Sequence, residues 1–339
     1  MMQTFHPVED FWSRQANAQA HVFRFAPLGA WAEVTANTPD VLEAARLSAR
    51  RYSAGGPFCA GDDLQLQLHL HLVVRQQATA LPPDDWPERL VYSGAGEWIT
   101  LSAGEWGHGF GNLETRTALV FLSPALAQQT RLVSRYVIDH YLLNFLFSEW
   151  AMLHASGALD PSGQKLLLLI GDHNMGKSTT ALRLLHAGYR FLADGMALLQ
   201  VRNGRIVVGG YPIGEVKLRD DVLALWPEYT GEAVRVREQR KTVVDLRAAH
   251  PGQIIEQLIT PAAITLCFTE RGVERQTRVE PITPEAARER LAANTVFWDA
   301  PARLEHNTRI LNHVLGNAHL HHLKLGSDPE HLISTLENL

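Results

Sequence analysis

The sequence lacks the features that mark secreted, membrane or nucleic-acid-binding proteins. Only two of its 339 residues are cysteines, Cys59 and Cys267, so it has neither a disulfide framework nor a clustered cysteine metal site. Its formal net charge of −5 provides no general attraction to nucleic acid or to anionic lipid. We therefore expect no nucleic-acid partner.

Long uninterrupted apolar runs are also scarce. The most apolar long stretch, residues 136–159, carries Asp139, His140 and Glu149 in its interior, which favours a buried helix over a membrane span. The first twenty residues lack the charged-then-apolar order of a secretory signal. We expect a soluble, cytoplasmic protein with no membrane partner.

The composition is that of an ordinary globular protein, with 46% hydrophobic and 20% charged residues. Its length favours two domains. Residues 64–74 alternate apolar and polar side chains, which is typical of a half-buried strand, whereas residues 123–153 form a helical pattern that predicts a long connecting helix. We expect a strand-rich α+β domain over residues 1–130, serving substrate recognition or assembly, and a second domain over residues 131–339.

The second domain shows alternating strand and helix patterns, which indicate an α/β fold. The run KLLLLI at residues 165–170 predicts a strand that is covered on both faces. A helix is expected from Lys177 to about Gly188, followed by a strand at residues 189–194. The pair Asn203-Gly204 predicts a hairpin turn.

A phosphate-binding motif follows the apolar run. Residues 171–178, GDHNMGKS, fit the pattern G-x-x-x-x-G-K-[ST] at every fixed position. In such a loop the backbone N–H groups surround a phosphate, the lysine contacts the β- and γ-phosphates, and the serine hydroxyl binds Mg²⁺. Asn174 replaces a frequent glycine but tolerates a left-handed conformation. The candidate nucleotide-binding residues are Gly171, Asp172, His173, Asn174, Met175, Gly176, Lys177, Ser178 and Thr179.

The alternative interpretation of this stretch is a plain strand–turn–helix connection with a surface lysine. The motif itself does not identify a reaction. The sequence contains no Asn-Lys-x-Asp segment for guanine recognition and no Leu-Ser-Gly-Gly-Gln segment, which argues against a GTPase and against a transporter ATPase.

Residues 153–200, from LHASGALD to ALLQ, resemble the catalytic domain of the HPr kinase/phosphorylase superfamily. They are most similar to shorter HPr-kinase-related proteins that carry a different amino-terminal domain. Residues 210–228 and 240–246 extend the resemblance. It implies an HPr kinase-like P-loop domain that uses ATP and Mg²⁺ to phosphorylate a serine or another hydroxyl of a protein, peptide or small molecule. It also implies a possible homo-oligomer, since the family often forms rings.

The resemblance assigns catalytic roles to Asp194, Lys177 and His154. Family members carry Asp-Asp where this chain reads Asp194-Gly195, and one carboxylate there acts as a base while the neighbourhood helps hold the metal. Ser178 and Asp194 are the candidate metal ligands. Because the second acid is missing, an ATP-binding regulatory module without phosphotransfer stays open, as does ATP hydrolysis coupled to a conformational change.

A structural role without catalytic function is the alternative for two of these residues. Asp194 lies at the carboxyl end of a strand that we expect beside the loop strand, where ligands collect in α/β sheets, but Asp before Gly is also a common turn pair. His154 could be a satisfied core histidine.

Other polar clusters are weaker candidates. Glu215 could supply a second metal carboxylate, but a solvated strand residue explains it. The basic run of Arg235, Arg237, Arg240 and Lys241 could hold phosphate or an acidic substrate segment, or could be a solvated face. Strands with outward polar residues explain the remaining histidines better than metal sites do; these are His69, His71, His319, His321 and His322.

Overall fold

The computed structural model describes residues 21–54, 67–75, 80, 89–236, 239–295 and 301–339. The chain divides into two compact units. The first comprises Met1–Arg50 and Pro57–Leu146, and the second comprises Arg51–Gly56 and Phe147–Leu339. The boundary that we placed near residue 130 therefore falls inside the first unit, because the helical segment after it packs against a helix of that unit.

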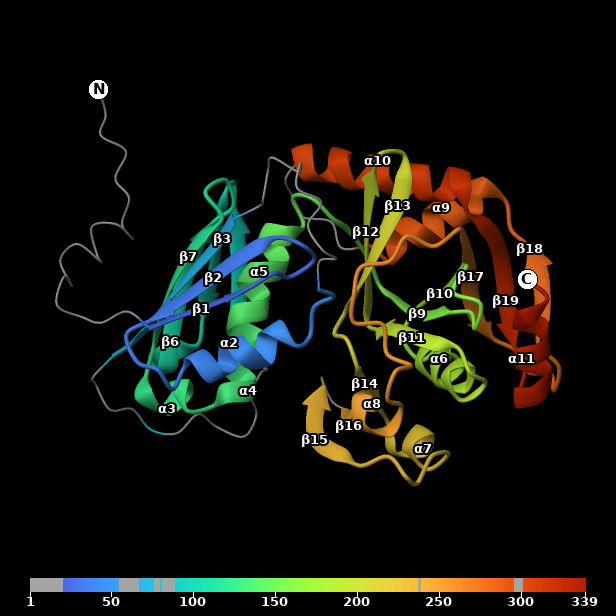
Figure 1. The fold of residues 1–339 in the computed structure, drawn as a ribbon, viewed down its shortest axis with the longest axis horizontal. Coiled ribbons are helices and arrows are strands. Elements are labelled where there is room, and N and C mark those ends of the chain that lie inside the picture. The colour runs from blue at the N-terminus through green and yellow to red at the C-terminus, as the bar shows by residue number, and fades with distance from the viewer. Residues whose placement is uncertain (1–20, 55–66, 76–79, 81–88, 237–238, 296–300) are drawn as a thin grey trace. The chain divides into compact units, whose positions relative to one another are not determined.

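Within the described residues, the first unit contains a mixed seven-stranded sheet in the order β1-β2-β3-β7-β6-β5-β4 (Figure 1). The strands are β1 (His21–Phe25), β2 (Trp31–Ala36), β3 (Gln67–Val74), β4 (Val91–Ala95), β5 (Trp98–Ser102), β6 (Gly107–Asn112) and β7 (Thr117–Leu122). The alternation predicted for residues 64–74 corresponds to β3, in which Leu68, Leu70 and Leu72 are fully buried. Residues 64–66 lie outside the described part of the chain.

Helices cover one face of this sheet (Figure 1). They are α2 (Leu42–Ala49), α3 (Pro124–Ala127), α4 (Thr130–Leu132), the π-helix η2 (Val133–Ile138) and α5 (Asp139–Leu146), with the 3₁₀ turn η1 (Gly104–Trp106) elsewhere. The single helix expected over residues 123–153 is therefore wrong. The helical segment is interrupted between α3 and α4, and its turns widen to a π-helix at η2. After α5 the chain forms the strand β8 (Ala151–Leu153), which pairs with residues 197–199 of the second unit.

A six-stranded sheet in the order β11-β9-β10-β17-β19-β18 is central to the second unit. The strands are β9 (Ala155–Leu159), β10 (Lys165–Ile170), β11 (Arg190–Asp194), β17 (Ala263–Arg271), β18 (Arg278–Pro281) and β19 (His319–Leu325). β10, β17 and β19 run parallel, and β9 and β18 run antiparallel to their neighbours. The unit is thus a mixed α/β structure, which agrees with the predicted class at this level.

Two smaller sheets and six helices complete the described part of the second unit. β13 (Arg205–Tyr211), β12 (Met196–Arg202) and β8 form one sheet, and β14 (Glu215–Leu218), β16 (Gln239–Asp245) and β15 (Gly231–Val236) form the other. The hairpin predicted at Asn203-Gly204 is confirmed, with φ values of 51° and 75°. The helices are α6 (Lys177–His186), α7 (Asp220–Leu223), α8 (Leu246–Ala249), α9 (Pro284–Ala293), α10 (Pro301–Asn317) and α11 (Pro329–Glu337).

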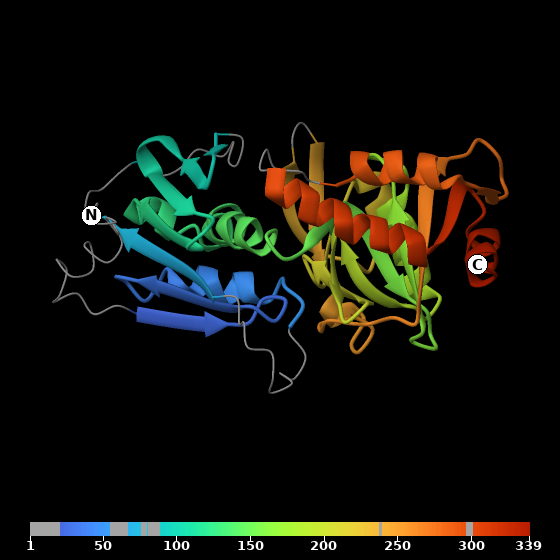
Figure 2. The same cartoon turned by 90° about the horizontal axis from the view of Figure 1, so that it is seen from above.

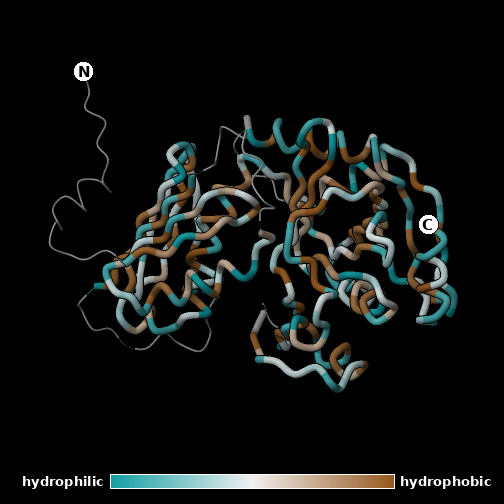
Figure 3. The backbone as a smooth tube through the Cα atoms, in the orientation of Figure 1, coloured by the Kyte–Doolittle hydropathy of each residue, from teal (hydrophilic) through white to brown (hydrophobic). Residues whose placement is uncertain are grey.

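The apolar run of β10 is required because both of its faces are buried. Leu166, Leu168 and Ile170 belong to a core that includes residues of α9 and α10, while Leu167 and Leu169 belong to a second core shared with α6 and α11. Successive side chains of a strand point to opposite faces, so a half-polar pattern could not fill both cores. Figure 2 shows α10 across one side of this unit, and Figure 3 shows the hydrophobic character of its inner strands.

The segment Arg51–Gly56 belongs to the second unit although it lies between α2 and β3 in the sequence. Ser53 Oγ accepts a hydrogen bond of 2.8 Å from the backbone N–H of Gly210. Ala54 forms an isolated bridge with Gln257, and the backbone carbonyl of Arg51 accepts from Ile213 at 2.9 Å. The chain therefore enters the second unit briefly before it completes the first.

Candidate active site

The loop between β10 and α6 has the strand–loop–helix order that the motif predicts. β10 ends at Ile170 and α6 begins at Lys177. Gly176, the residue before α6, has a φ of 85°, a left-handed conformation that glycine adopts without strain. Asn174 has a φ of 67°, so the expectation that asparagine adopts this conformation here is confirmed. No side chain caps the start of α6, so the first N–H groups of this helix point toward the loop without a side-chain partner.

Lys177 is buried rather than a surface lysine. Its side chain folds back over the loop, where Nζ donates hydrogen bonds of 2.6 Å to the carbonyl of Gly171 and 2.9 Å to that of Asp172. The residue is only 8% exposed. Burial lowers the pKa of Lys177, against the raising effect of the negative charges of Asp194 and Asp172. An anion bound at the loop would stabilise this buried cation.

Asp194 lies at the carboxyl end of β11 and binds two hydroxyl groups. Ser178 Oγ donates to Asp194 Oδ1 at 2.9 Å, and Ser156 Oγ donates to the same oxygen at 2.5 Å. The expectation that the Asp194 strand is adjacent to the loop strand is wrong, because β9 lies between β11 and β10. β9 is antiparallel to both of these strands, so β11 and β10 run parallel and end at the same edge of the sheet.

His154 lies at the same site. Its Nδ1 is 2.8 Å from the carbonyl of Gly195, so this nitrogen carries the proton and donates. Burial and then the positive charge of Lys177 lower the pKa of His154, which is therefore neutral at pH 7, with Nε2 as its acceptor. The imidazole of His173, from the loop, lies 5.3 Å away between ring centroids. The structure thus brings together His154, His173, Lys177, Ser178 and Asp194.

Gly195, which follows Asp194, has a conformation that suits glycine. Gly195 has a φ of 145°, in a region that residues with a side chain rarely adopt. Its carbonyl is the group that holds His154. An aspartate at this position would strain the turn that orients the histidine.

The oxygen atoms present fit a magnesium ion. The Ser178 hydroxyl and the Asp194 carboxylate are hard oxygen donors, which Mg²⁺ prefers, and Mg²⁺ usually retains several waters beside one or two protein ligands. A larger ligand set is absent from the described residues, in which no group of three or more His, Cys, Asp and Glu side chains is placed to hold a metal.

The remaining candidate residues occupy varied positions. Thr179 lies in the first turn of α6, and the N–H of Met175 donates to the carbonyl of Asp172 at 3.4 Å. Glu215 begins β14 opposite Asp245 of β16. The positive charge of Lys241, on β16, contributes to lowering the pKa of Lys177, so this member of the basic run lies near the loop.

Other parts of the predicted clusters are structural or lie outside the description. Arg237 falls outside the described residues, as does the side chain of Arg235. Arg240 is exposed on β16. His71 Nδ1 is 2.6 Å from the hydroxyl of Thr35, and His322 Nε2 is 2.9 Å from Glu270 Oε2. His69 lies in β3, and His319 and His321 lie in β19.

Sequence reasoning missed two residues of the site. Ser156 could have been found, because the pattern of residues 153–160 predicts a strand, in which Ser156, two residues after His154, would share its face. Arg219, at the start of α7, donates from Nη1 to Asn174 Oδ1 at 3.2 Å. No local pattern connects these two residues, which are 45 positions apart.

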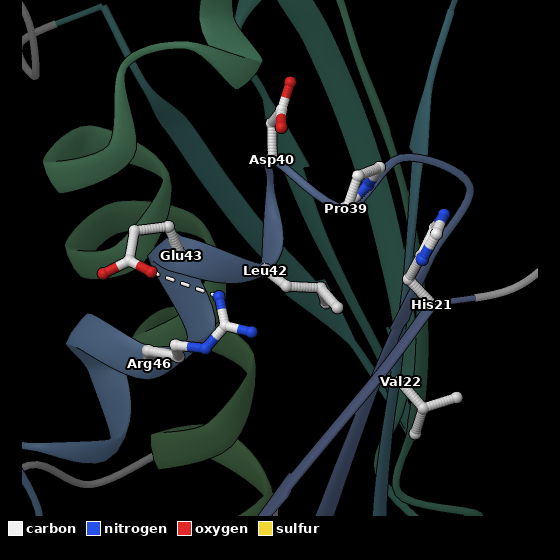
Figure 4. A pocket seen from close by; sticks show the side chains of 7 residues that line it. All are labelled: His21, Val22, Pro39, Asp40, Leu42, Glu43 and Arg46. Carbon is white, nitrogen blue, oxygen red and sulfur yellow. Dashed lines mark hydrogen bonds and ion pairs between the residues drawn. The ribbon is translucent and has the colours of Figure 1, made fainter.

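The first unit contains a separate cavity of about 520 Å³ beside β1 and α2 (Figure 4). An ion pair joins Glu43 and Arg46 at its wall, with a distance of 3.1 Å. Its lining residues are His21, Val22, Pro39, Asp40, Leu42, Glu43 and Arg46. They include none of the residues predicted for catalysis or nucleotide binding.

Comparison with known proteins leaves the family of the chain open. No family model matches the sequence, and no curated protein matches it. Among solved structures, the HPr(Ser) kinase/phosphatase from Coxiella burnetii is similar over 49% of this chain and 91% of that chain, at 13% sequence identity and a TM-score of 0.25. At this TM-score the likeness carries no argument about activity. No helix among the described residues is long and apolar enough to span a membrane.

Proposed function

We propose that the protein is an ATP-dependent kinase that transfers the γ-phosphate to a hydroxyl, with serine as the leading acceptor, of a protein, peptide or small molecule. The observation that carries the proposal is the convergence of Lys177, Ser178 and Asp194 at the uncapped start of α6. The resemblance of residues 153–246 to HPr-kinase-related proteins supports the same class of reaction.

The loop would bind the nucleotide. The N–H groups at the start of α6 and the helix dipole favour phosphate oxygens. Lys177 would exchange its bonds to the carbonyls of Gly171 and Asp172 for the β- and γ-phosphates. Ser178 and Asp194 would hold Mg²⁺, which when bound neutralises charge on the phosphates.

Asp194 would also serve the acceptor. Both serine hydroxyls bind Oδ1, so we assign Oδ2 to the proton of the acceptor hydroxyl. The acceptor oxygen forms a bond to the γ-phosphorus, the bond from that phosphorus to the β,γ-bridging oxygen breaks, ADP leaves, and Oδ2 takes the proton. Ser156 and Ser178 hold the carboxylate in position, and neutral His154 can accept a hydrogen bond at Nε2.

A second candidate is an ATP-binding regulatory module without phosphotransfer. Gly195 favours it, because the carboxylate that follows Asp194 in HPr kinases is missing. Simple ATP hydrolysis is a third and weaker candidate.

Transfer from γ-labelled ATP distinguishes these functions. The acceptors offered are peptides that contain serine, threonine or tyrosine, and the proteins of a cell extract. The assay measures the label on each acceptor and the phosphate released into solution. We expect Asp194→Asn to bind ATP within about threefold of wild type but to transfer at least about 100-fold more slowly, the range that acid–base catalysis supplies. Asp40→Asn, an exposed aspartate of the first unit, is the matched control.

Each outcome selects one function. Label on an acceptor supports the kinase, and release of phosphate without labelled acceptor supports the hydrolase. Tight binding without turnover supports the regulatory module. An Asp194→Asn variant that transfers at the wild-type rate would remove Asp194 from the role of base.

A further inference from the structure

Arg219 connects the small β14–β16–β15 sheet to the middle of the candidate phosphate loop. It follows β14 and stands directly before α7. Its Nη1 donates to Asn174 Oδ1 at 3.2 Å, which places the guanidinium beside the fourth residue of the loop. The Arg219 side chain is 27% exposed, so most of it is enclosed while one side stays open to solvent.

The same guanidinium is held by an anion of the protein. Nε donates to Asp221 Oδ1 at 2.9 Å and Nη2 donates to Asp221 Oδ2 at 2.5 Å, a two-pronged arrangement that a phosphate group can also accept. The Asp221 side chain is 63% exposed, and exposed ion pairs contribute little net stability. Arg219 can therefore exchange this partner for another anion at low cost.

Two further cations lie near the loop and could share such an anion with Arg219. Lys177 lies buried at the start of α6, and the charge of Lys241 acts on it from β16. Arg219 adds a third cation from the same small sheet region. Three cations, Lys177, Lys241 and Arg219, thus lie at or near the loop, together with the carboxylates of Asp172 and Asp194.

We propose that Arg219 recognises the terminal phosphate of the nucleotide and thereby makes the site prefer a nucleoside triphosphate to a diphosphate, with Asp221 as the internal anion that the γ-phosphate displaces. This inference rests on the proposed function, because it assigns a partner to a further residue of the same site. Arg219 is a specificity-determining residue, since its contact is with the phosphate that distinguishes ATP from ADP.

A purely structural role for Arg219 is the competing explanation. Its bond to Asn174 could fix the loop, and its removal would then weaken all nucleotides equally. Asn174→Gly separates the two roles: it removes this bond but keeps a residue suited to the left-handed φ of 67°. Asp221→Asn is the complementary test, because it weakens the ion pair that competes for Arg219 and leaves the guanidinium intact.

The experiment is calorimetric titration of the full chain with Mg·ATP and with Mg·ADP. We expect Arg219→Ala to weaken ATP binding about tenfold more than ADP binding, or about 1.4 kcal/mol. Asn174→Gly is expected to keep the wild-type ratio of ATP to ADP affinity, and Asp221→Asn to raise that ratio. The matched control is Arg309→Ala on α10, whose exposed side chain pairs with Glu305 at 3.9 Å.

The results separate this inference from the function beneath it. If wild type binds ATP and Arg219→Ala leaves the ATP-to-ADP ratio unchanged, the role of Arg219 is overturned and the nucleotide site stands. The same holds if Asn174→Gly reproduces the Arg219→Ala loss. If wild type binds neither nucleotide, the proposed function and this inference fall together. Circular dichroism and unfolding curves identify any variant that is misfolded. If Arg219→Ala is misfolded, Arg219→Lys replaces it, because lysine keeps the charge without the bidentate guanidinium. Arg219→Lys should show a ratio of ATP to ADP affinity between those of wild type and a full loss of the contact.

Discussion

Replacement of Lys177 by methionine tests whether this lysine serves a ligand or the fold. Methionine retains an unbranched chain of similar length but removes the ammonium group, which donates to the carbonyls of Gly171 and Asp172. Hydrogen bonds to charged groups contribute about 1.5–3 kcal/mol each, so a lysine with a structural role would cost about 3–6 kcal/mol on removal.

The opposing effect comes from burial. The pKa of Lys177 in the folded protein is below its ordinary value of 10.5, chiefly because burial removes water from the ammonium. Folding therefore disfavours the charged form, and at pH 7 the ionised lysine reduces stability instead of adding to it. We expect Lys177→Met to unfold within about 1 kcal/mol of wild type in urea, since this desolvation offsets the lost bonds.

The ligand-dependent effect should be much larger. Loss of two charge-assisted contacts to phosphate amounts to about 3–6 kcal/mol, which raises the dissociation constant for ATP by roughly 100-fold or more. Calorimetry with Mg·ATP and urea unfolding without nucleotide measure the two quantities on the same samples. A variant that loses 3 kcal/mol or more of stability, or that binds ATP within about threefold of wild type, would refute the assignment of Lys177 to the nucleotide.

Two further predictions concern the loop and the first unit. Gly176→Ala should destabilise the protein by about 2–3 kcal/mol, because φ is 85° and a Cβ would lie 2.7 Å from Leu325 Cδ1. Gly188→Ala should cost about 1 kcal/mol, because φ is 93° but the space around it is open. Equal losses in urea unfolding would contradict the steric argument. Burial lowers the pKa of His140 to about 4, so folding favours its neutral form, and this residue should contribute a loss of about 2 kcal/mol in stability as the pH drops from 7.5 to 5. His140→Leu should reduce the pH dependence by that amount, while the contribution of His71, whose pKa burial also lowers to about 4, remains. A variant with the wild-type pH profile would exclude His140 as a source.

Local signals were sufficient for the centre of the candidate site. The run before Gly171, the glycine before Lys177 and the helix after it are adjacent in the sequence, and each has its own physical cause. The hairpin at Asn203-Gly204 was predictable for the same reason, since a turn depends on the residues that form it. These are the parts of the fold where sequence neighbours are also neighbours in space.

The features that the sequence did not predict depend on contacts between residues that are far apart in the chain. The position of β9 between β11 and β10 depends on which distant strands pair, and this order brings Ser156 to the Asp194 oxygen that Ser178 also contacts. Arg219 reaches Asn174 only because β14 brings the start of α7 to the loop. Helix α10 was not predicted, and the π-helix η2 interrupts a stretch whose apolar pattern gave no sign of a wider turn.

The excursion of Arg51–Gly56 limits how this protein can be taken apart. A fragment that begins at Phe147 would lack the Ser53 acceptor for Gly210 and the pairing of Ala54 with Gln257. During synthesis, this short stretch leaves the ribosome long before residues 210 and 257, so its contacts can form only after those residues have been synthesised. Dissection of the two units therefore calls for a circularly permuted or co-expressed chain in which this stretch travels with the second unit.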